Sequence, residues 1–173
     1  MRKVILLAIA AFLNAADLSQ VIESPDATAI LKKDALSAAK AVTMIEGCIS
    51  NEPAVIARGK YIFHNLNGKD AKENPPEGLT RLLPDGKEKQ MGNCVACHNI
   101  EGAKGYGNIG PDLSNYKALY MDSGARNGQF VYQKIADPRV DNAKTHMTVN
   151  LTNGLFNERE VCDLASYVMA TKK

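Results

Sequence analysis

The chain has 173 residues, with 21 Lys and Arg against 19 Asp and Glu and a formal net charge of +2. This length suits a single domain with an ordinary hydrophobic core and a short extension. The nearly neutral charge excludes the strongly basic surface of a nucleic-acid-binding protein or of a protein held on an anionic membrane.

The first predicted element is a signal peptide over residues 1–16. Arg2 and Lys3 form a basic start, an almost wholly apolar run follows, and small residues end the segment at Ala16. A membrane-spanning helix needs about twenty apolar residues, and Asp17 interrupts this run too early. We therefore expect an exported protein in the bacterial periplasm, almost neutral once the two basic residues are removed.

Residues 17–50 are predicted to form an N-terminal helical extension. Residues 24–26 (Ser-Pro-Asp) have the composition of a helix start, and apolar residues recur at helical spacing as far as Gly47. The remaining residues, 51–173, form the predicted core domain.

The core domain opens with a helix predicted over residues 51–68, with Pro53 in its first turn. Gly59 interrupts this helix, which indicates that another helix approaches closely. His64 lies in the same helix, and we interpret it as a partly exposed or core histidine and not as a metal ligand. Residues 69–91 are rich in Lys, Pro, Gly and acidic residues, and predict an inserted surface loop. A solvated connector is favoured there over a partner-docking segment.

Cys94, Cys97 and His98 form the pattern C-x-x-C-H, the attachment site of a c-type haem. Thiols three residues apart share one face of a helical turn, so both can reach the vinyl groups on one edge of a porphyrin. His98 can then bind the iron as the proximal ligand. A zinc site would need a second pair of ligands at similar spacing, and the sequence has none. A thioredoxin-like redox site would lie near a βαβ pattern, which is also absent from the sequence. We therefore predict one haem c, attached through the two thiols.

A glycine-rich stretch follows the haem motif and ends at Gly110 and Pro111. Glycines allow the backbone to approach the haem closely. The carbonyl of Pro111 is expected to accept a hydrogen bond from Nδ1 of His98, which would fix the imidazole tautomer. Pro111 is thus a predicted part of the haem site.

Two more helices are predicted, over residues 130–136 and from about Asn157 towards the C-terminus. The last helix should cross the helix that contains Gly59. These elements predict an all-α, cytochrome c-like fold around one covalently attached haem.

The irregular stretch over residues 139–154 is expected to supply the second axial ligand of the iron. Met147 lies in this loop between two helices, where a distal ligand of a single-haem protein usually enters. The alternative is its neighbour His146, which would give bis-histidine ligation and a lower reduction potential.

Two cysteines lie outside the haem motif. In an oxidising compartment Cys48 and Cys162 are expected to form a disulfide, and the alternative is a pair of buried free thiols. The bridge would close a loop of more than 100 residues, so the chain-entropy treatment allows about 4–5 kcal/mol of stabilisation.

Residues 92–98 and 107–113, which read GNCVACH and GNIGPDL, resemble SoxX, the monohaem subunit of the SoxAX cytochromes of bacterial sulfur oxidation. Residues 131–139 and 145–147 look like later segments of the same family. The likeness runs from about Pro53 to the C-terminus. It differs at Thr148, where many family members have proline.

The resemblance implies a heterodimer with a SoxA-like haem subunit, which joins thiosulfate oxidatively to a cysteine of a SoxYZ-like carrier (L-cysteine S-thiosulfotransferase activity). This chain would take up the electrons and pass them to a downstream cytochrome. It would then not be catalytic by itself, with His98 as proximal and Met147 as distal ligand. The alternative is a free periplasmic electron shuttle without a catalytic partner, and a haem enzyme acting alone would need an open iron position.

Overall fold

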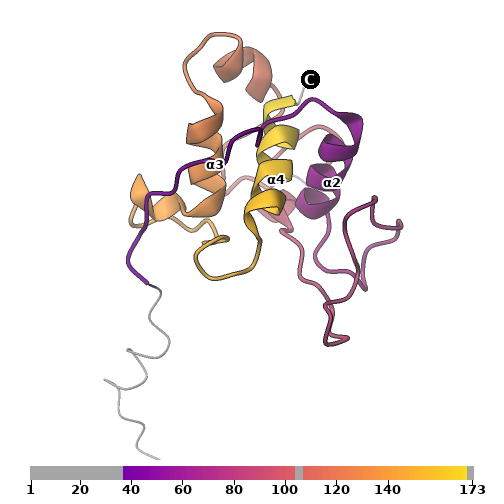
Figure 1. The fold of residues 1–173 in the computed structure, drawn as a ribbon. Helices are drawn as coiled ribbons and strands as arrows, with labels where there is room; N and C mark the ends of the chain where they lie inside the picture. Colours follow the sequence, from indigo (N-terminus) through magenta and orange to yellow (C-terminus); the bar gives the residue numbers. More distant parts are fainter. Residues whose placement is uncertain (1–36, 104–106, 171–173) are drawn as a thin grey trace, which may run out of the picture. The chain divides into compact units, whose positions relative to one another are not determined.

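The computed structural model describes residues 37–103 and 107–170. The described elements are α2 (Pro53–His64), η2 (Cys94–Ala96), η3 (Lys117–Met121), α3 (Gly128–Ala136), η4 (Pro138–Val140) and α4 (Glu158–Ala170), as Figure 1 shows. Within the described residues the extended pairing is limited to isolated bridges, and no strand forms, which confirms the all-α class. None of the helices described is long and apolar enough to cross a membrane. The signal peptide predicted for residues 1–16 lies outside the described residues.

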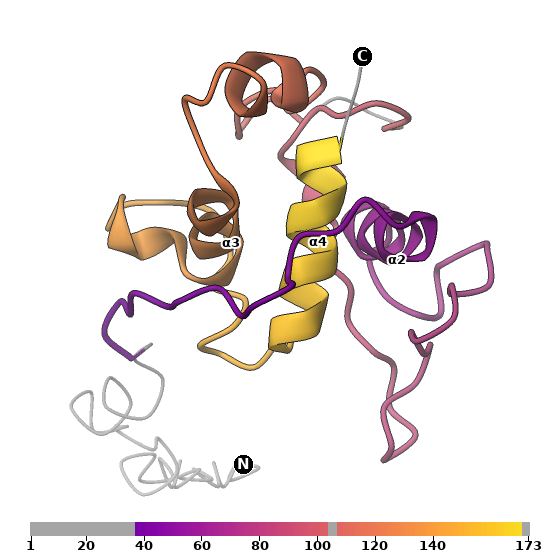
Figure 2. The same ribbon diagram turned by 45° about the horizontal axis from the view of Figure 1, so that its top comes forward.

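Helix α4 lies between α2 and α3 and contacts both (Figures 1 and 2). Its start is a reciprocal cap, because the backbone N–H of Glu160 donates to Asn157 Oδ1 at 2.9 Å and that of Asn157 donates to Glu160 Oε2 at 3.1 Å. The helix start therefore lies where the sequence predicts it. The core-facing apolar side chains of α4 are Val161, Leu164, Ala165 and Val168.

Helices α2 and α4 cross at Gly59. A Cβ there would overlap the backbone carbonyl of Asp163 and lie 2.7 Å from Cβ of Tyr167, so only glycine permits this approach. Beside the crossing, Arg58 donates from Nε and Nη2 to the Asp163 carboxylate at 2.7 and 2.9 Å. This bidentate pair satisfies a carboxylate that the helix contact buries.

Two helix boundaries differ from the predicted ones because asparagines cap them. Helix α2 ends at His64, three or four residues early, because Asn65 adopts an extended conformation and its side chain donates to Tyr61 O at 2.8 Å. Helix α3 begins at Gly128 because Asn127 Oδ1 accepts from the backbone N–H of Phe130 at 2.9 Å.

The predicted helical extension is wrong for residues 37–50, which we call the strap. They form an extended segment with one turn, drawn in indigo in Figure 1, where the strap runs across α3 and α4. Side-chain amides of α3 take the place of helical hydrogen bonds. Gln133 Oε1 accepts from Val42 N at 2.8 Å, and Gln129 accepts from Met44 N at 2.7 Å and donates to Val42 O at 2.8 Å. The earlier part of the predicted helix lies outside the described residues.

The strap is joined to α4 by a disulfide between Cys48 and Cys162, with both half-cystines buried and their Cα atoms 5.0 Å apart. This is the pair expected from the sequence. Ser166 adds a polar link, because its hydroxyl accepts from Ser50 N at 3.1 Å. The start of the described chain and the last helix are therefore covalently connected.

The surface loop over residues 69–91 is organised by Arg81. Its guanidinium donates to the backbone carbonyls of Gly68, Ala71 and Glu73 at 3.0, 2.9 and 2.6 Å. Near the end of the loop, Lys89 forms a largely buried ion pair with Glu160 at 2.8 Å. Arg81 therefore ties the loop to its own first residues, and Lys89 attaches its end to α4.

Candidate haem site

The three predicted haem-binding side chains come from one tight turn, η2 and the two residues after it. The carbonyl of Cys94 accepts from the backbone N–H groups of Cys97 at 3.1 Å and His98 at 2.9 Å. Asn93 precedes the turn in the left-handed conformation, with φ of 44°. This closed turn brings two thiols and an imidazole together.

The turn is bound to the end of α2 by backbone hydrogen bonds. Gly92 N donates to Ile62 O and Asn93 N to Asn65 O, both at 2.9 Å. Gly92 has no room for a side chain, since a Cβ there would lie 2.7 Å from the Sγ of Cys94. The first thiol is therefore positioned against the core helix.

His98 Nδ1 lies 2.9 Å from the carbonyl oxygen of Pro111. A carbonyl only accepts, so Nδ1 carries the proton and the lone pair of Nε2 is free to bind a metal. Gly110 packs against the imidazole, where a Cβ would lie 2.6 Å from Nδ1 and 2.8 Å from Nε2. A Cβ on Gly107 would similarly lie 2.7 Å from Cα of Cys97. The glycine-rich stretch thus packs directly against the haem motif.

Asn99 connects the histidine to the proline segment, and sequence reasoning missed it. Its side-chain amide donates to Asp112 Oδ2 and Ser114 Oγ, both at 3.1 Å. Its main-chain carbonyl accepts from Leu113 N at 2.8 Å. Hydrogen bonds from Ser114 and Asn99 lower the pKa of Asp112. The sequence does contain a pattern that could have indicated this role: a polar residue directly after His98, and an Asp-x-Ser turn directly after Pro111. This network holds the carbonyl of Pro111 in place.

Cys94 and Cys97 take no part in the disulfide between Cys48 and Cys162, so both thiols are available for attachment. Burial raises the pKa of Cys94 to about 12, so this thiol is protonated at neutral pH. Thioether formation adds an S–H group across a vinyl double bond, so both cysteines must be free of other bonds. Within the described residues there is no cluster of three or more His, Cys, Asp or Glu side chains that could hold a metal ion by itself.

Met147 is half-buried and packs against the core, whereas its neighbour His146 is exposed. Its backbone N–H donates to Thr145 Oγ1 at 3.1 Å. Three other half-buried methionines, Met44, Met121 and Met169, contact the same core. The choice of Met147 as distal ligand stays a prediction from its position in the chain.

The side chain of His64 faces Tyr167 of α4. Its Nε2 lies 2.8 Å from the hydroxyl of Tyr167, and its pKa is lowered by burial and by the charge of Lys60. This agrees with its interpretation as a core histidine.

These features fit a haem. The donor set is two thiols and an imidazole with a free Nε2, and glycines lie where a Cβ would collide with that set. Apolar side chains from η2 onwards that are only partly buried against the core would be available to contact such a group. They are Cys94, Val95, Ala103, Leu113, Tyr120, Met121, Phe130, Met147, Leu151, Leu155 and Met169.

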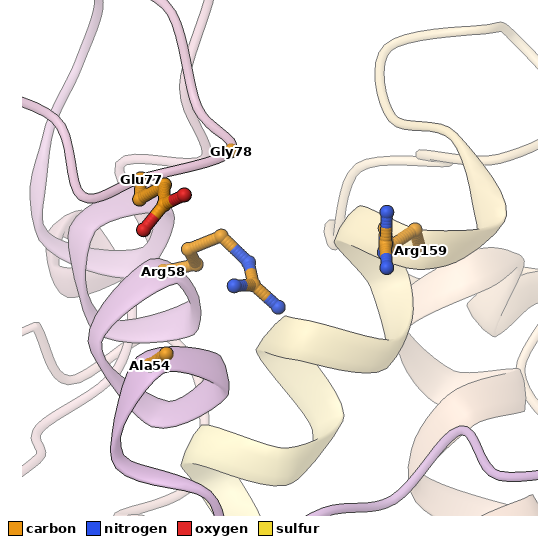
Figure 3. A pocket seen from close by; sticks show the side chains of 5 residues that line it. All are labelled: Ala54, Arg58, Glu77, Gly78 and Arg159. Carbon is orange, nitrogen blue, oxygen red and sulfur yellow. The ribbon is translucent and has the colours of Figure 1, made fainter.

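A shallow pocket of about 240 Å³ lies elsewhere, between α2, the surface loop and the start of α4 (Figure 3). Its lining residues are Ala54, Arg58, Glu77, Gly78 and Arg159. None of them belongs to the haem motif, and Arg58 already pairs with Asp163. Glu77 and Arg159 contribute opposite charges, so the pocket does not favour one sign of ligand.

The Cytochrome c family matches residues 83–172, just over half of the chain. Among solved structures, the c-type cytochrome SorU from Sinorhizobium meliloti is similar at 18% sequence identity. The match covers 70% of this chain and 99% of that chain, with a TM-score of 0.39. No curated protein matches the chain.

Proposed function

The chain belongs to the cytochrome c family, and from this premise we propose that it is a periplasmic monohaem cytochrome that accepts electrons from a SoxA-like partner. The family implies a covalently bound haem c and an electron-transfer function. The finer assignments are one haem, its attachment through Cys94 and Cys97, and the partner. The observation that supports the haem attachment is the geometry of His98, with Nδ1 bonded to Pro111 and Nε2 available for iron.

Each proposed haem-site residue has a separate task. Cys94 and Cys97 would form the thioethers, and His98 would bind the iron through Nε2. The hydrogen bond to Pro111 makes the imidazole a stronger donor and fixes its orientation. Met147 would supply a thioether sulfur as the second iron ligand, which favours reduced iron. The bound haem supplies one-electron exchange at its iron, and the protein sets how readily that exchange occurs.

The partner assignment is supported by the resemblance of residues 92–98 and 107–113 to SoxX. The proposed partner is a SoxA-like haem subunit, which couples thiosulfate to a cysteine of a SoxYZ-like carrier and releases electrons. This chain takes up those electrons and passes them to another cytochrome. Ile109 fits a partner-facing role near the haem, because it is 69% exposed and directly precedes the glycine that packs against His98.

Haem attachment is tested first, by a denaturing gel stained for haem. The wild type should retain the stain, and a Cys94→Ser/Cys97→Ser variant should lose it. A Cys48→Ser/Cys162→Ser variant is the matched control and should keep it. Retention of the stain by the first double variant would contradict the attachment.

The partner and the compartment are tested on the native protein in its source cells. Size exclusion of the periplasmic fraction should show this chain co-eluting with a second haem protein. The reconstituted pair should reduce this haem when thiosulfate and the carrier protein are added. A lone monomer at native abundance, with no reduction by thiosulfate, would favour the free electron shuttle.

A further inference from the structure

The loop over residues 138–151, which we call the distal loop, returns to the end of α3 from which it starts. The last carbonyls of a helix have no partner within it, and here the loop supplies partners for two of them. The side-chain amide of Asn150 donates to Ile135 O at 2.7 Å. The backbone N–H groups of Asn150 and Leu151 donate to Ala136 O at 3.1 and 3.0 Å. Both ends of the distal loop are therefore fixed at one helix terminus.

Asp137, the first residue after α3, connects the two ends of the distal loop. Its fully buried carboxylate accepts from Nε and Nη2 of Arg139, in η4, at 2.9 and 2.7 Å. It also accepts from the hydroxyl of Thr152, directly after the loop, at 3.2 Å. Hydrogen bonds to an ionised group are stronger than those between neutral groups. The carboxylate thus provides a charged link between the start of the loop and the chain after its end.

The strap is bound to the same junction. Nη1 of Arg139 donates to Ser37 O at 2.7 Å, and Lys40 N donates to Asp137 Oδ2 at 3.3 Å, where the strap begins beside η4 (Figure 1). Gln133 of α3 adds a further link, since its Nε2 donates to Asp137 O at 2.9 Å and to Lys40 O at 3.3 Å. A buried polar group that loses such a partner is not solvated again, so each of these contacts is costly to break.

Hydrogen bonds inside the distal loop connect Met147 to the same helix terminus. Asn142 N donates to Pro138 O at 3.2 Å, and Thr145 N donates to Asn142 O at 3.0 Å. Met147 N then donates to Thr145 Oγ1 at 3.1 Å. Three residues later, the buried Asn150 binds α3. Movement of Met147 away from the core therefore requires the breaking of contacts on at least one side of it.

We propose that Asn150 and Asp137 are positioning residues that hold the distal loop closed and so keep Met147 in place as the second iron ligand. The proposal rests on the haem and the ligand set of the proposed function. Closure of the loop keeps the methionine where it can bind, and opening withdraws it. An added ligand can take the vacated position only in open molecules, so its apparent affinity reports the fraction of molecules that are open.

The test measures the binding of imidazole to the ferric, haem-loaded protein by absorbance. Asn150→Ala leaves the carbonyl of Ile135 without its buried donor, so the apparent affinity for imidazole should rise about tenfold or more. Asn127→Ala is the matched control, because Asn127 caps the opposite end of the same helix. Its imidazole affinity should equal that of the wild type. Met147→Ala gives the upper limit, since it removes the competing ligand altogether.

Thr152→Val is a second variant that changes only an exposed hydroxyl, so it should fold even if Asn150→Ala does not mature. It removes the link from Asp137 to the chain after the loop, and the imidazole affinity should rise about fivefold. Thr80→Val is its matched control, because it removes a hydroxyl that donates to Leu82 O at 2.8 Å in the surface loop.

Hydrogen exchange separates loop opening from a general loss of stability. Both asparagine variants should unfold at lower urea concentrations than the wild type, because each loses a helix-end hydrogen bond. The amides of Thr145 and Met147 should exchange about tenfold faster in Asn150→Ala and at the wild-type rate in Asn127→Ala, because only Asn150 is released when the loop opens. A merely structural role would leave these loop amides unchanged in both variants.

An imidazole affinity within about twofold of the wild type in both Asn150→Ala and Thr152→Val would overturn the proposal. Equal increases in the two control variants would overturn it as well. If Met147→Ala binds imidazole no more tightly than the wild type, Met147 is not the iron ligand, and the ligand set of the proposed function fails together with this proposal. A wild type without haem would likewise overturn both.

Discussion

Removing the disulfide between Cys48 and Cys162 should cost about 4–5 kcal/mol of unfolding free energy. The bridge spans a sequence separation of 114 residues. In the chain-entropy treatment, a closed loop of that length removes about 16 cal/mol/K from the unfolded chain, or about 4.8 kcal/mol at room temperature. The side-chain amides of Gln129 and Gln133 still hold the strap in the folded state, so the loss should appear as stability and not as a changed fold.

The assay is urea unfolding of haem-loaded wild type and Cys48→Ala/Cys162→Ala, followed by far-ultraviolet circular dichroism and by haem absorbance. Wild type unfolded with a thiol reductant present is the control for the cavity that alanine leaves, because reduction cuts the bridge and keeps both sulfurs. Thioethers to haem are not cleaved by thiols, so the reductant acts only on the bridge. A double variant within about 1 kcal/mol of oxidised wild type would refute the reasoning.

Three further predictions concern the core and the haem site. Hydrogen bonds from Arg139 lower the pKa of buried Asp137 from 3.8 to about 2. The Asp137 carboxylate should therefore contribute about 2 kcal/mol to the free energy of unfolding above pH 4. This contribution should vanish as the pH falls through 2. Urea unfolding at a series of pH values should therefore show the difference in unfolding free energy between wild type and Asp137→Asn becoming smaller. A difference that does not change with pH would contradict this. Gly110→Ala should cost about 1–3 kcal/mol and change the reduction potential, because the added Cβ meets the ring of His98; an unchanged thermal midpoint and potential would argue against that packing. Ferric wild type should show the methionine–iron charge-transfer band, which Met147→Ala should abolish and Met121→Ala should keep; the reverse pattern would move the distal ligand to Met121.

Much of the haem site can be read from local patterns in the chain. Cys94, Cys97 and His98 lie within five residues, so one turn brings them together whatever the rest of the chain does. The bond from His98 to Pro111 spans 13 residues and follows from the Gly-Pro signal. The caps at Asn127 and Asn157 are local as well, although only the second was used to predict a helix start.

The helical prediction for the strap failed for a physical reason. Helical spacing of apolar residues indicates which side chains can share a face of a helix. It does not indicate whether side chains elsewhere in the chain will bind the backbone N–H and C=O groups in a non-helical conformation. Here Gln133 and Gln129, 91 and 85 residues away along the chain, accept from the N–H groups of Val42 and Met44 and hold the backbone in an extended form. β-branched Val42 and Thr43 also favour that form.

By itself the sequence determined the all-α class, the haem-attachment turn, the core helices and the cysteine pair left for a disulfide. Local hydrogen bonding and side-chain spacing are sufficient for the first three, and the cysteine pair is what the haem motif leaves over. Only the tertiary structure decided the path of the strap, the links from Asn99 to Asp112 and Ser114, and the contacts that join the strap to Asp137 and Arg139. Those contacts join side chains whose approach depends on how α2, α3 and α4 pack, and no spacing along the chain encodes that distance.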